Sequence, residues 1–143
     1  MDGFRFSTDV RVRFAETDAQ RIAHNATYLV WFEVARVAYL DEFTAGYRAF
    51  QDAGYEATVV EAHVRYQTPA VFDDVIRIWT RCVDVRGARF RYDYALSRLG
   101  DGAQIAEGWT THACVDAHTL RPTRLPQWIV DAIAKAESSP RAS

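Results

Sequence analysis

The segment at residues 26–43 constrains the fold more than any other part of the chain. Large apolar side chains recur in it at the spacing of one helical face, and further apolar residues widen that face. The two groups are Tyr28, Phe32, Ala35, Tyr39 and Phe43, and Leu29, Trp31 and Leu40. A helix that is apolar nearly all round has to be wrapped by other elements. We therefore expect a central helix, capped at its N-terminus by Asn25 or Thr27.

The other patterned segments have the two-residue alternation of half-buried strands. One precedes the helix and four follow it, at residues 10–14, 60–66, 75–85, 89–96 and 105–115. Shorter helices are predicted between Gly46 and Gly54 and at residues 127–137. Because short turns join the later strands, we expect an antiparallel sheet with the long helix across its concave face, which is an α+β fold. Small residues on one face of the last strand would let the helix approach closely.

The length of 143 residues suits a single domain, and 49% hydrophobic residues suffice for one core. We expect this domain at residues 1–137, followed by a disordered tail at residues 138–143. One helix cannot cover both faces or both edges of such a sheet. A second copy of the chain is therefore expected to close the exposed edge or face.

Charge and hydropathy exclude several classes of partner. Lys and Arg number 17 and Asp and Glu 19, for a net charge of −2, so the chain has no strong basic field for nucleic acid. No stretch approaches the length of a membrane span. The first residues include an acid where a signal peptide has a base, and they lack its long apolar run. We expect a cytoplasmic protein.

Few segments of the sequence match a recognisable catalytic or ligand-binding motif. The sequence contains no Gly-rich phosphate loop, nucleophile elbow or zinc-protease motif, and neither a metal nor another cofactor is expected. His112, Asp116 and His118 have a superficial likeness to metal ligands. The first falls on a strand and the others in the turn after it, which favours a polar strand end. Cys82 and Cys114 are interpreted as small buried apolar residues.

The loop between Asp18 and Asn25 is the strongest candidate for chemistry. It places a carboxylate a few residues before the N-terminus of the most buried helix. The amides of that terminus are unpaired and carry positive partial charge, so they can stabilise a developing oxyanion. A carboxylate facing such a group is the minimum equipment for acyl transfer. The alternative is that Asp18 only caps a turn.

Several motifs, in their order and spacing, resemble those of one family. They lie at residues 14–19 (FAETDA), 28–36 (YLVWFEVAR), 68–74 (TPAVFDD), 85–89 (VRGAR), 114–116 (CVD) and 121–126 (RPTRLP). The family is that of the hotdog-fold acyl-CoA thioesterases, and the resemblance is strongest to the 4-hydroxybenzoyl-CoA thioesterase and YbgC-like group. It extends from about residue 8 to about residue 130.

The resemblance implies a hotdog fold, in which a five-stranded antiparallel sheet wraps the central helix. It also implies a homodimer or homotetramer, an active site at the subunit interface, and no metal. By position, Asp18 matches the catalytic aspartate, and the backbone N–H of Asn25 matches the amide that polarises the thioester carbonyl. Arg86 matches the basic turn that contacts the nucleotide, with Arg89 as a nearby candidate.

The loop departs from the family pattern. Gln20 and Arg21 stand where many relatives have glycine, which enters positive φ freely, so the loop path and the acyl pocket are expected to differ. His24 and Tyr28 are predicted to contact the substrate, with His24 either a second proton-transfer group or a solvent-facing loop residue. Glu33 lies about 12 Å along the helix, which favours a structural role and leaves it a reserve candidate for the acid.

The predicted reaction is hydrolysis of an acyl-CoA thioester to a free acid and CoA. The thioester oxygen accepts a hydrogen bond from the amide of Asn25, and Asp18 either attacks the carbonyl carbon or activates a water. Three alternatives stay open: a substrate bound to an acyl carrier protein, a dehydratase acting on 3-hydroxyacyl thioesters, and a domain that binds acyl-CoA without catalysis. Release of a free thiol distinguishes a thioesterase from the last two.

Overall fold

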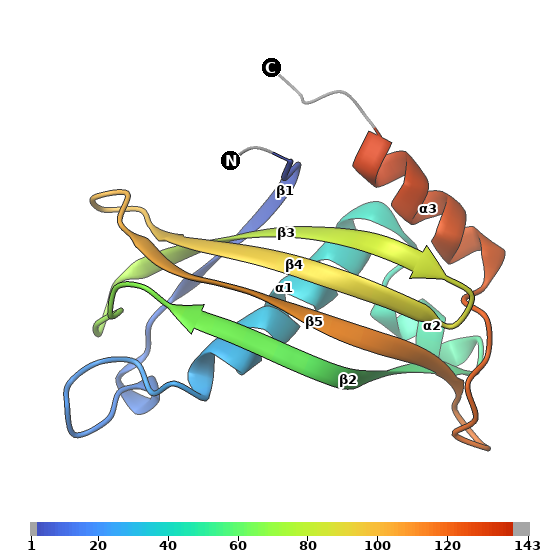
Figure 1. Cartoon of the computed structure of the whole chain (residues 1–143), viewed down its shortest axis with the longest axis horizontal. Helices are drawn as coiled ribbons and strands as arrows, with labels where there is room; N and C mark the ends of the chain where they lie inside the picture. The colour runs from blue at the N-terminus through green and yellow to red at the C-terminus, as the bar shows by residue number, and fades with distance from the viewer. Residues whose placement is uncertain (1–2, 139–143) are drawn as a thin grey trace.

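The computed structural model describes residues 3–138, which form one antiparallel sheet and three α-helices (Figure 1). The sheet has the strand order β1-β3-β4-β5-β2. The strands are β1 (Phe6–Arg11), β2 (Tyr55–Tyr66), β3 (Val75–Arg86), β4 (Arg89–Arg98) and β5 (Gln104–Asp116). The helices are α1 (Thr27–Phe43), α2 (Tyr47–Asp52) and α3 (Gln127–Ser138), and a 3-10 turn, η1, comprises Phe14–Glu16.

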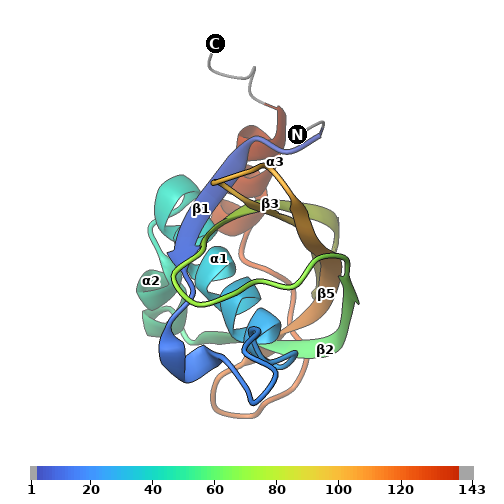
Figure 2. The same cartoon turned by 90° about the vertical axis from the view of Figure 1, so that its left-hand side faces the viewer.

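The sheet curls around α1, so that the helix lies along its concave face (Figure 2). Phe32 of α1 is fully buried there and stacks on Tyr94 of β4, with ring centroids 3.9 Å apart. A small residue on β5 permits this close approach. A Cβ on Gly108 would lie 2.9 Å from the ring of Phe32 and would collide with the carbonyl oxygen of His63. The predicted α+β fold, with five antiparallel strands around a central helix, is confirmed.

The predicted boundaries of two strands are wrong. β1 comprises Phe6–Arg11 rather than residues 10–14, because β3 pairs with those six residues and the chain then turns away. Phe14 therefore lies in η1, with 75% of its surface exposed. β2 begins at Tyr55 rather than at residue 60, because Tyr55 already pairs with Asp116 of β5. In both strands the partner, and not the alternation of side chains, sets the boundary.

β1 and β2 are the two edge strands of the sheet, and an apolar surface borders the edge of β2. Its side chains are between 37% and 51% exposed: Leu29, Val30, Val34 and Val37 on α1, and Val59 and Val60 on β2. Helix α1 is therefore only partly enclosed by its own sheet. An open edge with an apolar border is the kind of surface that another chain covers.

The C-terminal end of the described chain belongs to α3. Ser138, which was predicted to begin a disordered tail, is the last residue of this helix, and the rest of the predicted tail, residues 139–143, lies outside the described residues. Among residues 3–138, no helix is both long and apolar enough to cross a membrane.

Candidate active site

A hollow of about 530 Å³ opens at the N-terminal end of α1. The loop before the helix, the first turn of the helix and the end of β2 with the segment after it contribute its walls. The lining residues are Asp18, Gln20, Ile22, Ala23, Asn25, Tyr28, Tyr66, Gln67, Thr68 and Pro69. The N–H of Ala23 donates to the carbonyl oxygen of Ala70 at 2.8 Å and so joins the loop to the segment before β3. Three predicted site residues, Asp18, Asn25 and Tyr28, thus meet in one hollow.

Asp18 is held by a tight turn of its own loop. Its Oδ1 accepts the N–H of Gln20 at 2.8 Å, and its carbonyl oxygen accepts the N–H of Arg21 at 2.9 Å. Arg21 has a φ of 66°, so a non-glycine residue adopts the left-handed conformation at this point of the loop. Asp18 therefore does cap a turn. Within residues 3–138 its other oxygen, Oδ2, accepts no hydrogen bond, and this oxygen is available for a substrate or a water.

The N–H of Asn25 has no acceptor among the described residues. The next peptide along the chain is held by Tyr66, whose hydroxyl donates to the Asn25 carbonyl oxygen at 2.8 Å. The Tyr66 ring packs edge-on against the ring of Tyr28, with centroids 4.9 Å apart. Burial raises the pKa of Tyr28 and that of Tyr66, so both phenols stay neutral. Among the residues that line the hollow, Asp18 thus has a carboxylate oxygen, and Asn25 a backbone N–H, without a partner in the described chain.

The predicted cap of α1 is wrong. The N-cap residue is Ala26, and its N–H donates to Nδ1 of His24 at 3.1 Å. Thr27 instead directs its hydroxyl to the carbonyl oxygen of Glu16, and the Asn25 side chain makes no capping bond. The imidazole of His24 therefore occupies the place of a cap. It is exposed and is not among the residues that line the hollow, so its contact with substrate stays a prediction.

Comparison with known proteins identifies the family. The family model of the thioesterase-like superfamily matches residues 12–133. The chain belongs to this superfamily. It is 29% identical over 123 residues to the acyl-CoA thioesterase YbgC of Haemophilus influenzae, a match that covers 85% of this chain and 89% of that protein.

Solved structures agree with this assignment to the thioesterase-like superfamily. The protein TT1821 of Thermus thermophilus has a TM-score of 0.83 at 31% identity, covering 90% of this chain and 96% of that one. The DHNA-CoA thioesterase of Staphylococcus aureus has a TM-score of 0.84 at 25% identity, covering 92% and 90%. The fold is the hotdog fold of the thioesterases, and the chain is a thioester hydrolase.

The two arginines predicted to contact the nucleotide lie away from this hollow. Arg86 and Arg89 flank the turn between β3 and β4 and line a separate groove of about 400 Å³, together with Glu61, Asp84, Phe90, Arg91, Thr111 and His112. The Asp18 loop adjoins the start of β3, whereas Arg86 ends it. Twelve residues of strand span about 36 Å, and Figure 1 shows the two segments at opposite ends of the sheet. One chain does not bring them together.

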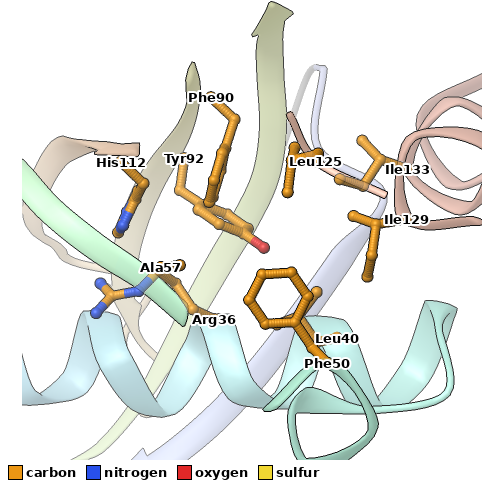
Figure 3. A pocket seen from close by; sticks show the side chains of 10 residues that line it. All are labelled: Arg36, Leu40, Phe50, Ala57, Phe90, Tyr92, His112, Leu125, Ile129 and Ile133. Atoms are coloured by element: carbon orange, nitrogen blue, oxygen red, sulfur yellow. The ribbon is translucent and has the colours of Figure 1, made fainter. Parts of the chain in front are cut away.

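A second, internal cavity lies near the other end of α1 (Figure 3). Its walls are mostly apolar, and α3 closes one side with Ile129 and Ile133. On the opposite side lie Arg36 and His112. Its volume is about 60 Å³. This cavity shares no lining residue with the hollow at Asp18 and is a feature of the core.

His112 is 2% exposed and belongs to a buried polar chain, so for this residue the interpretation as part of a polar strand end is wrong. Arg36 donates to the Tyr94 hydroxyl at 3.1 Å, which bonds Thr110 Oγ1 at 2.7 Å, and that hydroxyl bonds His112 Nε2 at 2.7 Å. Burial, with a further contribution from the charge of Arg36, lowers the pKa of His112 to about 3. Its imidazole is therefore neutral across the physiological range.

The remaining candidates from the sequence have structural surroundings. Cys82 and Cys114 are buried, free thiols, and burial raises the pKa of both, so neither resembles a reactive thiolate. Asp116 accepts the N–H groups of His118 and Thr119, which makes it the cap of its own turn. No group of three or more residues suited to hold a metal occurs within residues 3–138.

Sequence reasoning missed Tyr66 as a site residue. Its hydroxyl donates to the Asn25 carbonyl oxygen, yet Tyr66 lies 41 residues further along the chain. Glu33, the reserve candidate for the acid, is exposed on α1 and lines the groove between α1 and β2 rather than the hollow. The alternation of β2 could have placed Tyr66 at a strand end, but nothing local indicates which loop that end adjoins.

Proposed function

We propose that this protein hydrolyses acyl-CoA thioesters, with Asp18 as the catalytic carboxylate. The observation that supports it best is the pairing, in one hollow, of a free oxygen of Asp18 with the unpaired N–H of Asn25 at the helix terminus. The name of the YbgC relative supports an acyl-CoA substrate. The thioester carbonyl would accept from Asn25, where the N-terminal dipole of α1 favours negative charge.

Asp18 can bring about hydrolysis by two routes. In one, Asp18 Oδ2 bonds to the carbonyl carbon, the carbon–sulfur bond breaks, CoA leaves as thiolate, and water then opens the anhydride. In the other, Asp18 takes a proton from a water as that water attacks the same carbon; the carbon–sulfur bond then breaks, and CoA leaves as the thiol when Asp18 returns the proton. In both routes the carbonyl oxygen, which develops negative charge, keeps its hydrogen bond from the N–H of Asn25. Because thiolate is a good leaving group, neither route needs a strong acid beside the sulfur.

The test of this function is thiol release from a panel of acyl-CoAs with short, long and aryl acyl groups. Each acyl group is also presented on a phosphopantetheine-bearing carrier protein. We expect CoA release, with the panel ranking the acyl groups. Thiol release from the acylated carrier protein, but from no acyl-CoA, would identify the carrier-bound thioester as the substrate in place of acyl-CoA. Binding or dehydration without thiol release would contradict the proposal.

We further propose that two copies of the chain form the working unit and that each completes the other's site. The supporting observations are the open, apolar-bordered edge of β2 and the separation of Arg86 from Asp18 along one sheet. Antiparallel pairing of two β2 edges would set the Asp18 end of one sheet beside the Arg86 end of the other. Arg86 and Arg89 of the second copy would then approach the CoA phosphates.

Sedimentation velocity tests this assembly. We expect a mass of about 33 kDa, twice the 16.3 kDa of one chain, or a multiple of that dimer. Val34→Asp places a charge on the exposed apolar face of α1 and should release monomers without thiol-releasing activity. Leu99→Asp is the matched control, because Leu99 is as exposed as Val34 and its turn bonds the start of β3 rather than the β2 edge. A wild-type monomer with full activity would contradict the proposal.

A further inference from the structure

Glu16 is a buried carboxylate two residues before Asp18, and 9% of it is exposed. Both of its carboxylate oxygens are bonded. Oε1 accepts the backbone N–H of Arg13 at 2.8 Å, and Oε2 accepts the indole N–H of Trp31 at 3.1 Å. The Arg13 guanidinium lies 3.4 Å from Oε2 and is exposed to solvent. Trp31 is 2% exposed and lies on the second turn of α1, so this carboxylate ties η1 directly to the helix.

The backbone of Glu16 makes a second connection to the same helix end. Its carbonyl oxygen accepts the N–H of His24 at 2.7 Å and the hydroxyl of Thr27 at 3.4 Å. His24 directly precedes Asn25, whose N–H has no acceptor among the described residues. Through its carbonyl oxygen, Glu16 thus holds the start of the loop against the end of the loop at His24 and against Thr27, the first residue of α1.

The chemistry of these bonds suits a rigid support. A buried carboxylate is stable only when hydrogen bonds replace its water, and bonds to a charged acceptor are stronger than neutral ones. Removing one partner leaves a buried polar group unpaired, which is costly. A reaction geometry is sensitive to such support, because a misplacement of about 1 Å can lower the rate by about 10²-fold.

We propose that Glu16 is the positioning residue of the site: through Trp31 and His24 it holds the Asp18 carboxylate and the Asn25 amide at a fixed separation. It touches neither the substrate nor the reacting atoms. This inference rests on the proposed function, because it assumes that Asp18 and the Asn25 amide act together on one carbonyl group.

Glu16→Gln and Trp31→Phe test the connection from its two ends. A glutamine has one acceptor oxygen for two donors, and its NH₂ opposes one of them, whereas phenylalanine removes the indole donor and keeps an aromatic ring. We expect each variant to lower kcat for thiol release about 10- to 100-fold, with KM within about twofold of the wild type. Because both remove the same bond, the double variant should lose no more than about twofold beyond the worse single variant.

Glu42→Gln is the matched control, since Glu42 is an exposed carboxylate near the other end of α1 and should keep its wild-type kcat. Urea unfolding of every variant identifies conditions in which all are folded, and kcat is compared there. Hydrogen exchange at the His24 amide should be faster in Glu16→Gln. Wild-type kcat in the folded Glu16 and Trp31 variants would overturn the inference, as would losses that multiply in the double variant.

Failure of the proposed function gives a different result in the same experiment. If Asp18→Asn keeps wild-type activity, or if the wild type releases no thiol from any acyl-CoA, the function fails and takes the positioning role with it. If Asp18→Asn is inactive while Glu16→Gln and Trp31→Phe match the wild type, the function stands and only the inference about Glu16 is overturned.

Discussion

Replacing Asp18 by Asn should lower kcat for thiol release by about 10³-fold or more, because an amide can neither attack a thioester as a nucleophile nor accept a proton from water. The substitution is close to isosteric. Asn Oδ1 can still accept the N–H of Gln20, the bond that Asp18 Oδ1 makes at 2.8 Å. The turn should therefore persist, and the free energy of unfolding should stay within about 0.5 kcal/mol of the wild type.

Asp18→Ala separates the two roles of this side chain. It removes the turn bond together with the carboxylate, so it should lose activity as Asp18→Asn does and also some stability, by about 1 kcal/mol. Steady-state thiol release and urea unfolding of the three proteins measure both effects. Turnover by Asp18→Asn near that of the wild type would remove Asp18 from catalysis and leave it the turn cap that it also is.

Acid should destabilise the folded protein through His112, and the effect should be about 3 kcal/mol at pH 4. The pKa of His112 is about 3 in the folded chain, against an ordinary value of about 6.5 in the unfolded chain. As pH falls below about 6.5, the unfolded chain binds a proton that the folded chain does not. Stability is therefore complete above that pH and is lost progressively toward pH 3, at about 1.4 kcal/mol per pH unit.

His112→Gln isolates this contribution, because glutamine can bond Thr110 and does not titrate. The variant should be less stable at pH 7, since it loses the stacking of the imidazole on Phe90, whose ring centroid lies 5.1 Å away. Between pH 7 and pH 4, its free energy of unfolding should nevertheless fall by about 3 kcal/mol less than that of the wild type. Urea unfolding at both pH values measures this difference. Parallel loss of stability in the two proteins would show that His112 takes up its proton in the folded state.

The elements of the fold could be predicted from local periodicity. The helical spacing in residues 26–43 and the alternation in the later strands each depend on residues a few positions apart, and both patterns are realised as α1 and as β2 to β5. The strand boundaries at Arg11 and Tyr55 could not be predicted in this way. They depend on how far a partner strand continues, and the partners of β1 and β2 are distant in sequence.

The candidate site divides in the same way. Asp18 and Asn25 are close in sequence, and a carboxylate placed just before a buried helix was enough to predict that they would lie together. Tyr66 and Trp31 gave no such signal, because each contributes through a bond to a distant residue. The cap of α1 was misassigned for a related reason. The His24 imidazole accepts the N–H of Ala26 in place of a capping Asn25 side chain. The Glu16 carbonyl oxygen accepts the Thr27 hydroxyl, which is therefore not used as a cap.

The sequence by itself determined the family, the type and order of the elements, and the carboxylate before the central helix, because motifs and periodicity are local properties of the chain. Only the tertiary structure decided which ends of the elements meet. It placed Tyr66 against Asn25, Glu16 against Trp31 and His112 inside the core, and it set Arg86 at the far end of the sheet from Asp18. These contacts follow from strand register and from the curl of the sheet, which depend on the packing of the whole domain.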